Sequence, residues 1–253
     1  MTLPHYEIGP RPIFRFTLDP VEDITPWMPG HRLSWFALTC GTYHIDLGAA
    51  KLYEWIDPPH HVEYQVAHWF FDLLTSAGDI LDPIPDSVSR WFFDDSLLAT
   101  ANRYYEHDEQ IEAQFGYDRL NALDSMFYKR LIDTLPLVDL MRIYAWRAHD
   151  YVYIEWDNRV PPTDIRLTAD VGYTRLPAGR YADELRDFHR RLIHAMAKRV
   201  PHAMARADCD ASDVEEAHLK HEQSIESELI RQGDPVDWDS IEPLLKWLAD
   251  RST

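Results

Sequence analysis

The segments MRIYAW at residues 141–146 and YVYIEW at residues 151–156 flank His149-Asp150 and are rich in aromatic and β-branched residues. Two such runs around a short polar connection predict an antiparallel β-hairpin. A third short strand is expected to include residues 173–176. From Gly179 to Val200 apolar residues then recur at helical spacing, which predicts an amphipathic helix.

The amino-terminal part of the chain shows the period of strands as well. Residues 13–18 (IFRFTL) alternate apolar and polar side chains, as in a half-buried strand. Residues 33–38 and 43–47 are expected to form two more strands joined through Gly41, where glycine would supply the positive φ of a tight hairpin. These segments together predict an amino-terminal antiparallel meander.

Helical spacing covers much of the middle of the chain. A helix is expected to start after Asp57-Pro58-Pro59 and to end near Gly78. Two more helical patterns follow, over about residues 97–111 and 120–135. The pair Asp94-Asp95 is expected to cap a helix.

Two further helices are expected near the end of the sequence. One covers roughly residues 212–230, and the other runs over residues 241–248 with Asp237 or Asp239 as its N-cap. The predicted fold class is therefore α+β, in which an antiparallel β-meander and a hairpin are combined with about six helices.

Composition indicates a packed protein in spite of its charge. The 253 residues carry a formal net charge of −18, but 45% are apolar and 13% aromatic, which is too hydrophobic for a disordered chain. No glycine-rich or serine-rich tether divides the sequence. We expect a single α+β domain over residues 1–253, with possible sub-divisions at 1–56 (β-meander), 57–138 (helical) and 139–253 (hairpin and C-terminal helices).

The same features exclude several kinds of partner. No segment has the pattern of a signal peptide or a membrane span, and the two cysteines, Cys40 and Cys209, match a reducing compartment, so a cytoplasmic location is expected. The acidic excess argues against binding to nucleic acid and to anionic membranes. It instead suits a basic protein partner, although solubility alone would also explain an acidic surface.

Several short segments resemble one known family. They are Arg15-Phe16, residues 33–39 (LSWFALT), Gly41-Thr42-Tyr43, Glu63-Tyr64-Gln65-Val66, and residues 188–200 around Phe188-His189-Arg190-Arg191-Leu192. They are similar to a family of bacterial proteins, frequent in actinobacteria, known only as a domain of unknown function. The segment from about Arg90 to Leu135 fits the family pattern least. The resemblance implies a small cytosolic protein of a kind often encoded beside polymorphic toxin genes, and it implies no catalytic or binding residue.

Histidines at helical spacing form two candidate metal sites. The candidate ligands are His61, His68 and Asp72 in the first group and His218, His221 and Glu222 in the second group. Such residues are more typical of solvated helix faces with side-chain pairs four residues apart. The metal interpretation would make the protein a metal-dependent hydrolase. No nucleophile elbow or phosphate-binding glycine loop is present, so no catalytic residue is assigned and no cofactor is expected.

An acidic segment without any Lys or Arg, between Tyr105 and Tyr117, is the most unusual part of the charge pattern. The candidate partner-binding residues are Tyr104, Tyr105, Glu106, Asp108, Glu109, Glu112 and Tyr117. Aromatic rings could anchor a protein partner while the carboxylates steer it. Alternatively the helix packs these rings into its own core.

A second acidic run, over residues 208–228, has a simpler explanation. It is expected to lie beside the basic helix of residues 186–206, which would neutralise part of its charge. The expected function is therefore that of a non-enzymatic, acidic protein-binding module, in its sharpest form an immunity-type protein that neutralises a basic toxin. A metal-dependent hydrolase and a homo-oligomeric scaffold, such as a homodimer, remain as alternatives.

Overall fold

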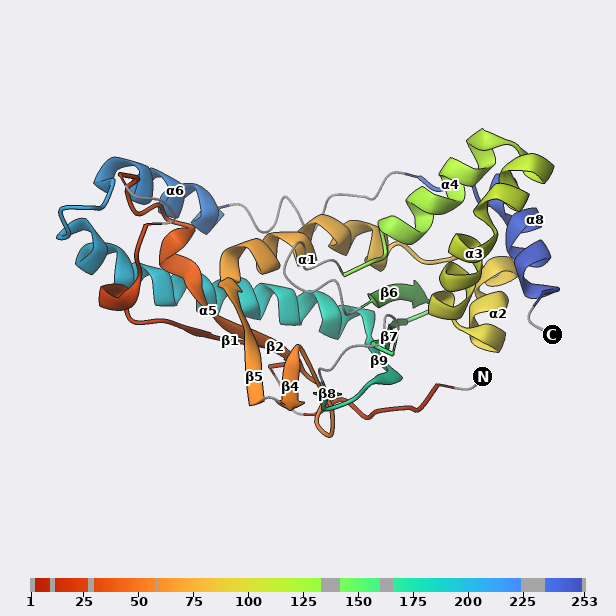
Figure 1. The fold of residues 1–253 in the computed structure, drawn as a ribbon, viewed down its shortest axis with the longest axis horizontal. Helices are drawn as coiled ribbons and strands as arrows, with labels where there is room; N and C mark the ends of the chain where they lie inside the picture. Colours follow the sequence, from red (N-terminus) through yellow and green to blue (C-terminus); the bar gives the residue numbers. More distant parts are fainter. Residues whose placement is uncertain are drawn as a thin grey trace.

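The computed structural model describes residues 3–9, 12–26, 30–57, 59–132, 142–159, 166–223 and 235–251. Residues 55–57, 59–62 and 166–167 are described by their backbone alone. The molecule is elongated, with a β-sheet and two long helices toward one end and a group of helices at the other (Figure 1). The fold is of the α+β class with antiparallel sheets, as the sequence predicts.

The larger sheet is antiparallel and has the order β1-β2-β5-β4-β8, with β3 paired to β2. Its strands are β1 (Phe14–Leu18), β2 (Cys40–Asp46), β3 (Lys51–Leu52), β4 (Glu54–Asp57), β5 (Pro59–Gln65) and β8 (Arg166–Leu167). The strand predicted at residues 13–18 is confirmed. The strand predicted at residues 33–38 is wrong, because this segment includes the start of a short 3₁₀ helix, Ala37–Thr39, that leads into β2.

Gly41 is needed for a different reason from the one expected. It lies inside β2 opposite Leu18 of β1, not in a hairpin turn. A Cβ atom at this position would lie 2.0 Å from the backbone oxygen of Thr17. The close approach of β1 to β2 therefore requires a residue without a side chain here.

The helix expected directly after Asp57-Pro58-Pro59 begins later. Residues Pro59–Gln65 form β5, which pairs with β2 and β4, and α1 covers Val66–Leu81. Because β2 and β4 pair with both edges of this segment, it forms a strand although the prolines favour the start of a helix. His61 is consequently on a strand and does not share a helix with His68 and Asp72, as the helical spacing of the first candidate metal site assumes.

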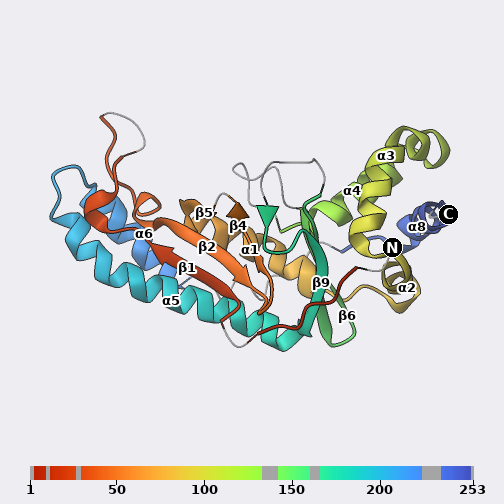
Figure 2. The same ribbon diagram turned by 60° about the horizontal axis from the view of Figure 1, so that its bottom comes forward.

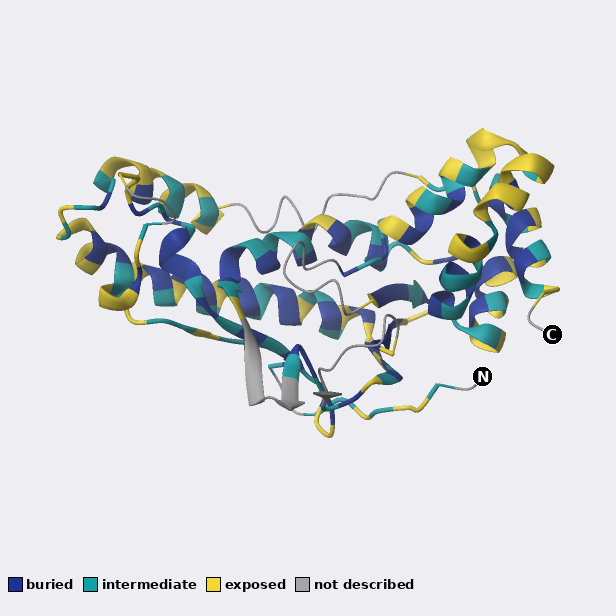
Figure 3. Ribbon diagram, in the orientation of Figure 1, coloured by how far each residue is buried: buried dark blue, intermediate teal, exposed yellow. Residues whose placement is uncertain are grey.

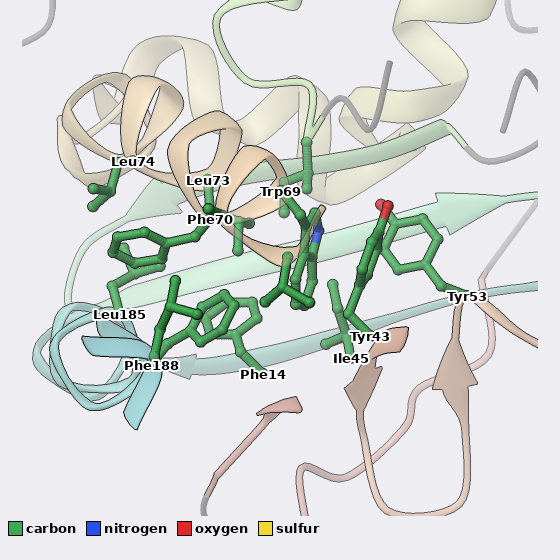
Figure 4. Close-up of a cluster of buried hydrophobic side chains, with 14 of the residues drawn as sticks. Phe14, Tyr43, Ile45, Tyr53, Trp69, Phe70, Leu73, Leu74, Leu185 and Phe188 are labelled. Carbon is green, nitrogen blue, oxygen red and sulfur yellow. The ribbon is translucent and has the colours of Figure 1, made fainter. Parts of the chain in front are cut away.

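The first hydrophobic cluster lies between the larger sheet and two helices, α1 and α5 (Ala178–Met204). In Figure 4, Trp69 of α1 lies between Tyr43 and Phe188. The ring centroids of Trp69 and Tyr43 are stacked 4.3 Å apart, and Phe188 of α5 lies 5.2 Å from Trp69. The amphipathic helix predicted from Gly179 to Val200 is confirmed and is somewhat longer. The buried residues of this cluster run from Ile13 to Val214, so the three sequence sub-divisions share one core.

The smaller sheet separates this cluster from a second one. It has the order β6-β7-β9, formed by β6 (Arg142–Ala148), β7 (Tyr151–Asp157) and β9 (Val171–Pro177), which confirms the predicted hairpin and third strand. Ile143 and Ile154 face the first cluster, whereas Trp146 and Tyr153 face the second. Because both faces are covered, nearly every residue of β7 is buried.

Four helices pack on the second face of this sheet, at the far end of the molecule (Figure 2). They are α2 (Asp86–Asp95), α3 (Leu97–Phe115), α4 (Tyr117–Tyr128) and α8 (Trp238–Ala249). The patterns over residues 97–111, 120–135 and 241–248 correspond to α3, α4 and α8, although residues 133–135 lie outside the described part. Helix α2 was not predicted.

The helix caps agree in part with expectation. Asp237 caps α8, since its Oδ1 accepts a hydrogen bond from the Ser240 N–H at 3.2 Å. Asp94-Asp95 is the end of α2 and is not an N-cap, which is supplied to α3 by Ser96. The Ser96 hydroxyl accepts a hydrogen bond from the Ala99 N–H at 3.0 Å.

Helix α6 (Ala211–Gln223) packs against α5 at the opposite end of the molecule (Figure 1). The ring nitrogen Nε2 of His189 donates to the carbonyl oxygen of His221 at 2.7 Å and so ties the two helices together. Asp187 of α5 binds Arg190 and Arg191 of the same helix at 3.1 and 2.8 Å, so part of the basic charge on α5 is balanced within α5 itself. The rest of the helix predicted over residues 212–230 lies outside the described residues. None of the helices described is both long and apolar enough to cross a lipid bilayer.

Candidate functional site

The acidic segment predicted as a partner-binding surface forms the projecting end of the α3–α4 pair. We call residues 105–118 the acidic tip. Glu106, Asp108, Glu109 and Glu112 are all exposed there, and Asp118 adds a further exposed carboxylate at the start of α4. Exposed residues cover this end of the pair in Figure 3. The tip therefore presents at least five carboxylates to solvent.

The aromatic rings of this segment divide into two sets. Tyr105 and Tyr117 are 44% and 62% exposed. Tyr104 is only 4% exposed and packs against Phe127 with its ring centroid 5.5 Å away, so it belongs to the second hydrophobic cluster and not to the surface. Phe115 is half-buried against Trp247. The rings available to a partner at the tip are thus those of Tyr105 and Tyr117.

Tyr105 is held in place although it is exposed. Its hydroxyl donates to Oδ1 of Asp124 at 3.4 Å, and the guanidinium of Arg142 lies 5.5 Å from its ring centroid. Burial of the hydroxyl and the nearby Asp124 raise the pKa of Tyr105. A fixed aromatic ring loses little conformational entropy when a partner covers it.

Helix α3 is interrupted within the tip. His107 has φ −129° and ψ 16°, which are not helical angles. Directly after it, Oδ1 of Asp108 accepts a hydrogen bond from the Glu109 N–H at 2.7 Å. The His107 ring meets Trp247 of α8 edge to face at 6.1 Å. Packing on α8 therefore anchors one side of the tip while its carboxylates face solvent.

The two histidine groups lie near each other, but against aromatic rings. His68 of α1 stacks on Phe36 with ring centroids 4.6 Å apart, and burial lowers the pKa of His68. His221 of α6 lies 5.6 Å from the same Phe36 ring and 4.4 Å from Trp35. Burial, with a smaller effect of nearby Lys220, lowers the pKa of His221 to about 4.

These contacts do not form the predicted metal sites. Nδ1 of His218 accepts a hydrogen bond from the Trp35 indole N–H at 3.4 Å. Asp72 is half-buried, Glu222 is exposed, and the side chain of His61 lies outside the described residues. Among the side chains that are described, no three His, Cys, Asp or Glu groups come together in a way that could hold a metal ion. The geometry therefore gives the metal-dependent hydrolase no support.

A cavity that the sequence analysis missed lies where the smaller sheet meets α2 and α3. We call it the Glu155 pocket. Its volume is about 340 Å³, within the usual range for small-molecule sites. Its walls include Trp146, Tyr153 and Phe93, with Asp94 and Arg175 near its opening and Glu155 lining it from β7.

Glu155 is the most unusual residue of this pocket. Its side chain is on a central strand of a sheet covered on both faces, and only 3% of the residue is exposed. Oε1 accepts a hydrogen bond from the Trp146 indole N–H at 3.0 Å, and Oε2 accepts one from the Leu98 N–H at 3.1 Å. Burial raises the pKa of Glu155 to about 7, although these hydrogen bonds act in the opposite direction.

The first turn of α3 is built around this carboxylate. The Leu98 N–H is one of the amide groups at the start of α3 that have no partner within the helix. The helix dipole also favours a negative charge at this position. Ser96, which caps the helix, has φ 63° and ψ 148°, a conformation that non-glycine residues rarely adopt. One of the three non-glycine residues with positive φ in the described part of the chain therefore lies in the wall of the pocket.

A sequence signal for Glu155 does exist. In the segment YVYIEW, Glu155 is the only charged residue, and apolar residues occupy positions of both strand faces around it. A lone carboxylate in a strand that is buried on both sides has to be neutralised or hydrogen-bonded, which makes it a candidate for function. The sequence analysis instead places its candidate site at residues 104–117, where acidic and aromatic residues occur together.

Comparison with known proteins gives a family and no activity. No curated protein and no solved structure matches the chain. One family model, described as "Family of unknown function (DUF5984)", matches residues 13–244. The match includes the larger sheet, the acidic tip and the lining of the Glu155 pocket except Leu3. The chain is therefore a member of the DUF5984 family.

Proposed function

We propose that this protein is a non-enzymatic binding module whose acidic tip engages a basic protein partner. The observation that carries the proposal is the exposure of Glu106, Asp108, Glu109 and Glu112 in a segment without Lys or Arg, next to the exposed rings of Tyr105 and Tyr117. Carboxylates of one sign steer an oppositely charged partner, and aromatic rings at the centre of an interface supply most of the binding energy.

The shape of this region also supports the proposal. The α3–α4 pair stands at one extremity of the elongated molecule, away from the larger sheet (Figure 2). A partner could therefore cover the tip without displacing any element of the first hydrophobic cluster. Tyr105, held by Asp124 and Arg142, offers a ring in a defined orientation.

In its sharpest form, the proposal is that of an immunity-type protein. The acidic tip would cover the basic active surface of a toxin, for example a nuclease, and so block access of its substrate. We further propose a cytoplasmic location, where free thiols such as those of Cys40 and Cys209 stay reduced.

The proposal is tested by reversing the charge of the tip. Tagged wild-type protein and a Glu106→Lys/Glu109→Lys/Glu112→Lys variant are used to recover partners from native cell extract at low and at high salt. We expect a basic protein to be recovered by the wild type at low salt, to be lost at high salt, and to be absent with the variant. Recovery of the same basic protein by the wild type and by the variant would overturn the proposal.

The matched control reverses three exposed carboxylates elsewhere. Asp213, Glu215 and Glu216 of α6 are also exposed, and they lie at the opposite end of the molecule (Figure 1). A variant with Lys at these three positions has the same net charge as the tip variant. Because screening limits the range of a surface charge to about 10 Å, this control should recover the partner as the wild type does. Equal loss in both variants would mean that only net charge matters.

A further inference from the structure

We propose that the Glu155 pocket is a binding site for a small organic cation of the ammonium type. This site is separate from the acidic tip and does not depend on the function proposed for the tip. Aromatic rings form its walls, a buried carboxylate lies at its base, and a second carboxylate stands at its opening.

The aromatic rings pack directly against one another and together form one wall of the pocket. The ring centroid of Phe93 lies 5.3 Å from that of Trp146 and 5.3 Å from that of Tyr153. Trp146 and Tyr153 are stacked at 4.6 Å, which fixes both rings. Phe93 is 47% exposed and forms the edge of the opening. Ring faces attract a cation placed within about 6 Å of their centroids, most strongly where water is excluded.

The charges of the pocket favour a cation over an anion. Glu155, Asp94 and Asp95 line it, against one guanidinium, that of Arg175. Asp95 forms an ion pair with Arg103, which leaves Glu155 and Asp94 as the carboxylates acting on a ligand. Arg175 is exposed, with its guanidinium 5.1 Å from the ring centroid of Tyr151, which lies outside the pocket.

Glu155 and Asp94 would contribute to ligand binding in different ways. The oxygens of Glu155 already accept hydrogen bonds from Trp146 and Leu98, so Glu155 acts on the ligand mainly through its charge. Asp94 is exposed at the opening and can accept a hydrogen bond from the ligand directly. Burial raises the pKa of Glu155 to about 7, and a bound cation would draw this carboxyl back toward its ionised form.

The test uses choline as the probe and isothermal calorimetry as the measurement. The control ligand is 3,3-dimethylbutan-1-ol, which has the shape of choline but no charge, and acetate serves as the anionic control. We expect choline to bind at least about tenfold more tightly than the neutral alcohol, and acetate not to bind. Equal binding of choline and the alcohol, stronger binding of acetate, or no binding of choline at about 10 mM would each overturn the proposal.

Variants locate the binding within the pocket. Glu155→Gln, Asp94→Asn and Phe93→Ala should each weaken choline binding by about fivefold or more, and Arg175→Gln should strengthen it by roughly twofold to threefold. If Glu155→Gln fails to fold, the Asp94→Asn and Phe93→Ala variants test the proposal. Both residues are exposed, so their substitution should leave the fold intact. Tyr128→Ala, which removes an exposed ring on α4, is the matched control and should leave binding unchanged. Unaltered binding in Asp94→Asn and Phe93→Ala would place choline elsewhere and contradict the assignment.

Discussion

The indole N–H of Trp146 donates to the carboxylate of Glu155 at 3.0 Å, from one strand of the hairpin to the next. Trp146 pairs directly with Tyr153, so Glu155 is its diagonal neighbour on the same face of the sheet. The second oxygen of this carboxylate binds the first turn of α3. One buried carboxyl group thus connects the smaller sheet to the helix that carries the acidic tip.

The first prediction concerns how stability depends on pH through Glu155. Its pKa is raised by burial from 4.5 to about 7, so the folded state prefers the protonated form. The stabilisation is fully present below about pH 4.5 and is lost as the pH rises through about 7. The loss amounts to roughly 3 kcal/mol at most. Glu155→Gln, which stays neutral, should not show it.

Urea unfolding of both proteins at about pH 5 and pH 8 measures this effect. The free energy of unfolding of the wild type, relative to that of Glu155→Gln, should fall from the lower to the higher pH. Titration of other groups is common to both proteins and cancels in the difference. A difference that does not change with pH would show that Glu155 is not buried as described.

The second prediction concerns the close approach of β1 and β2. Gly41→Ala should lower the free energy of unfolding by roughly 2–4 kcal/mol, because the added Cβ would lie 2.0 Å from the Thr17 oxygen. Gly179→Ala is the matched control, since the residue is on helix α5 and, apart from the local backbone, the added Cβ would meet no described atom within 4 Å. That control should be neutral or stabilising by up to about 1 kcal/mol. Similar effects of both substitutions would refute this register.

The third prediction separates the two sets of aromatic residues at the tip. Tyr104→Ala should destabilise the protein by about 3 kcal/mol or more, because it removes a ring from the second hydrophobic cluster. Tyr117→Ala, at an exposed position, should change the free energy of unfolding by no more than about 0.5 kcal/mol. Thermal unfolding of the two variants measures both values. The reverse order would mean that Tyr104 is the exposed ring and Tyr117 the buried one.

The fourth prediction concerns His221. Burial among Trp35, Phe36 and Phe71 lowers its pKa to about 4, so the folded state keeps the ring neutral. The resulting stabilisation is present above about pH 6.5 and is lost as the pH falls toward 4. An NMR titration, with the signal assigned by a His221→Gln variant, should give this low pKa. Titration of His221 near 6.5 would place the ring in solvent.

Much of the fold could be predicted from periodicity. The hairpin of β6 and β7 and the long helix α5 have patterns that tertiary contacts reinforce, and both predictions are confirmed. Residues 59–65 begin with the second proline of a pair that normally starts a helix, yet they form β5 because β2 and β4 both pair with them. The pairing with β2, which is distant in the sequence, leaves no local pattern.

The sites were harder to predict for the same reason. The charge pattern identified the exposed carboxylates of the acidic tip, but not that Tyr104 turns inward. The histidine spacing suggested metal ligands, whereas aromatic rings from distant segments surround His68 and His221. The Glu155 pocket is formed by three sheet strands and two helix ends that are far apart in the sequence, so only the fold brings them together.

Site-specific photo-crosslinking in the native cell tests the proposed binding surface most directly. A photoreactive residue is placed at Tyr117 or, as a control, at Tyr128, which is on the same helix and equally exposed at 62%. We predict that position 117 crosslinks to a basic protein, identified by mass spectrometry, that position 128 does not, and that the Glu106→Lys/Glu109→Lys/Glu112→Lys variant loses the product. Equal crosslinking at both positions, a product with a second copy of this chain, or no product at position 117 would contradict the proposal.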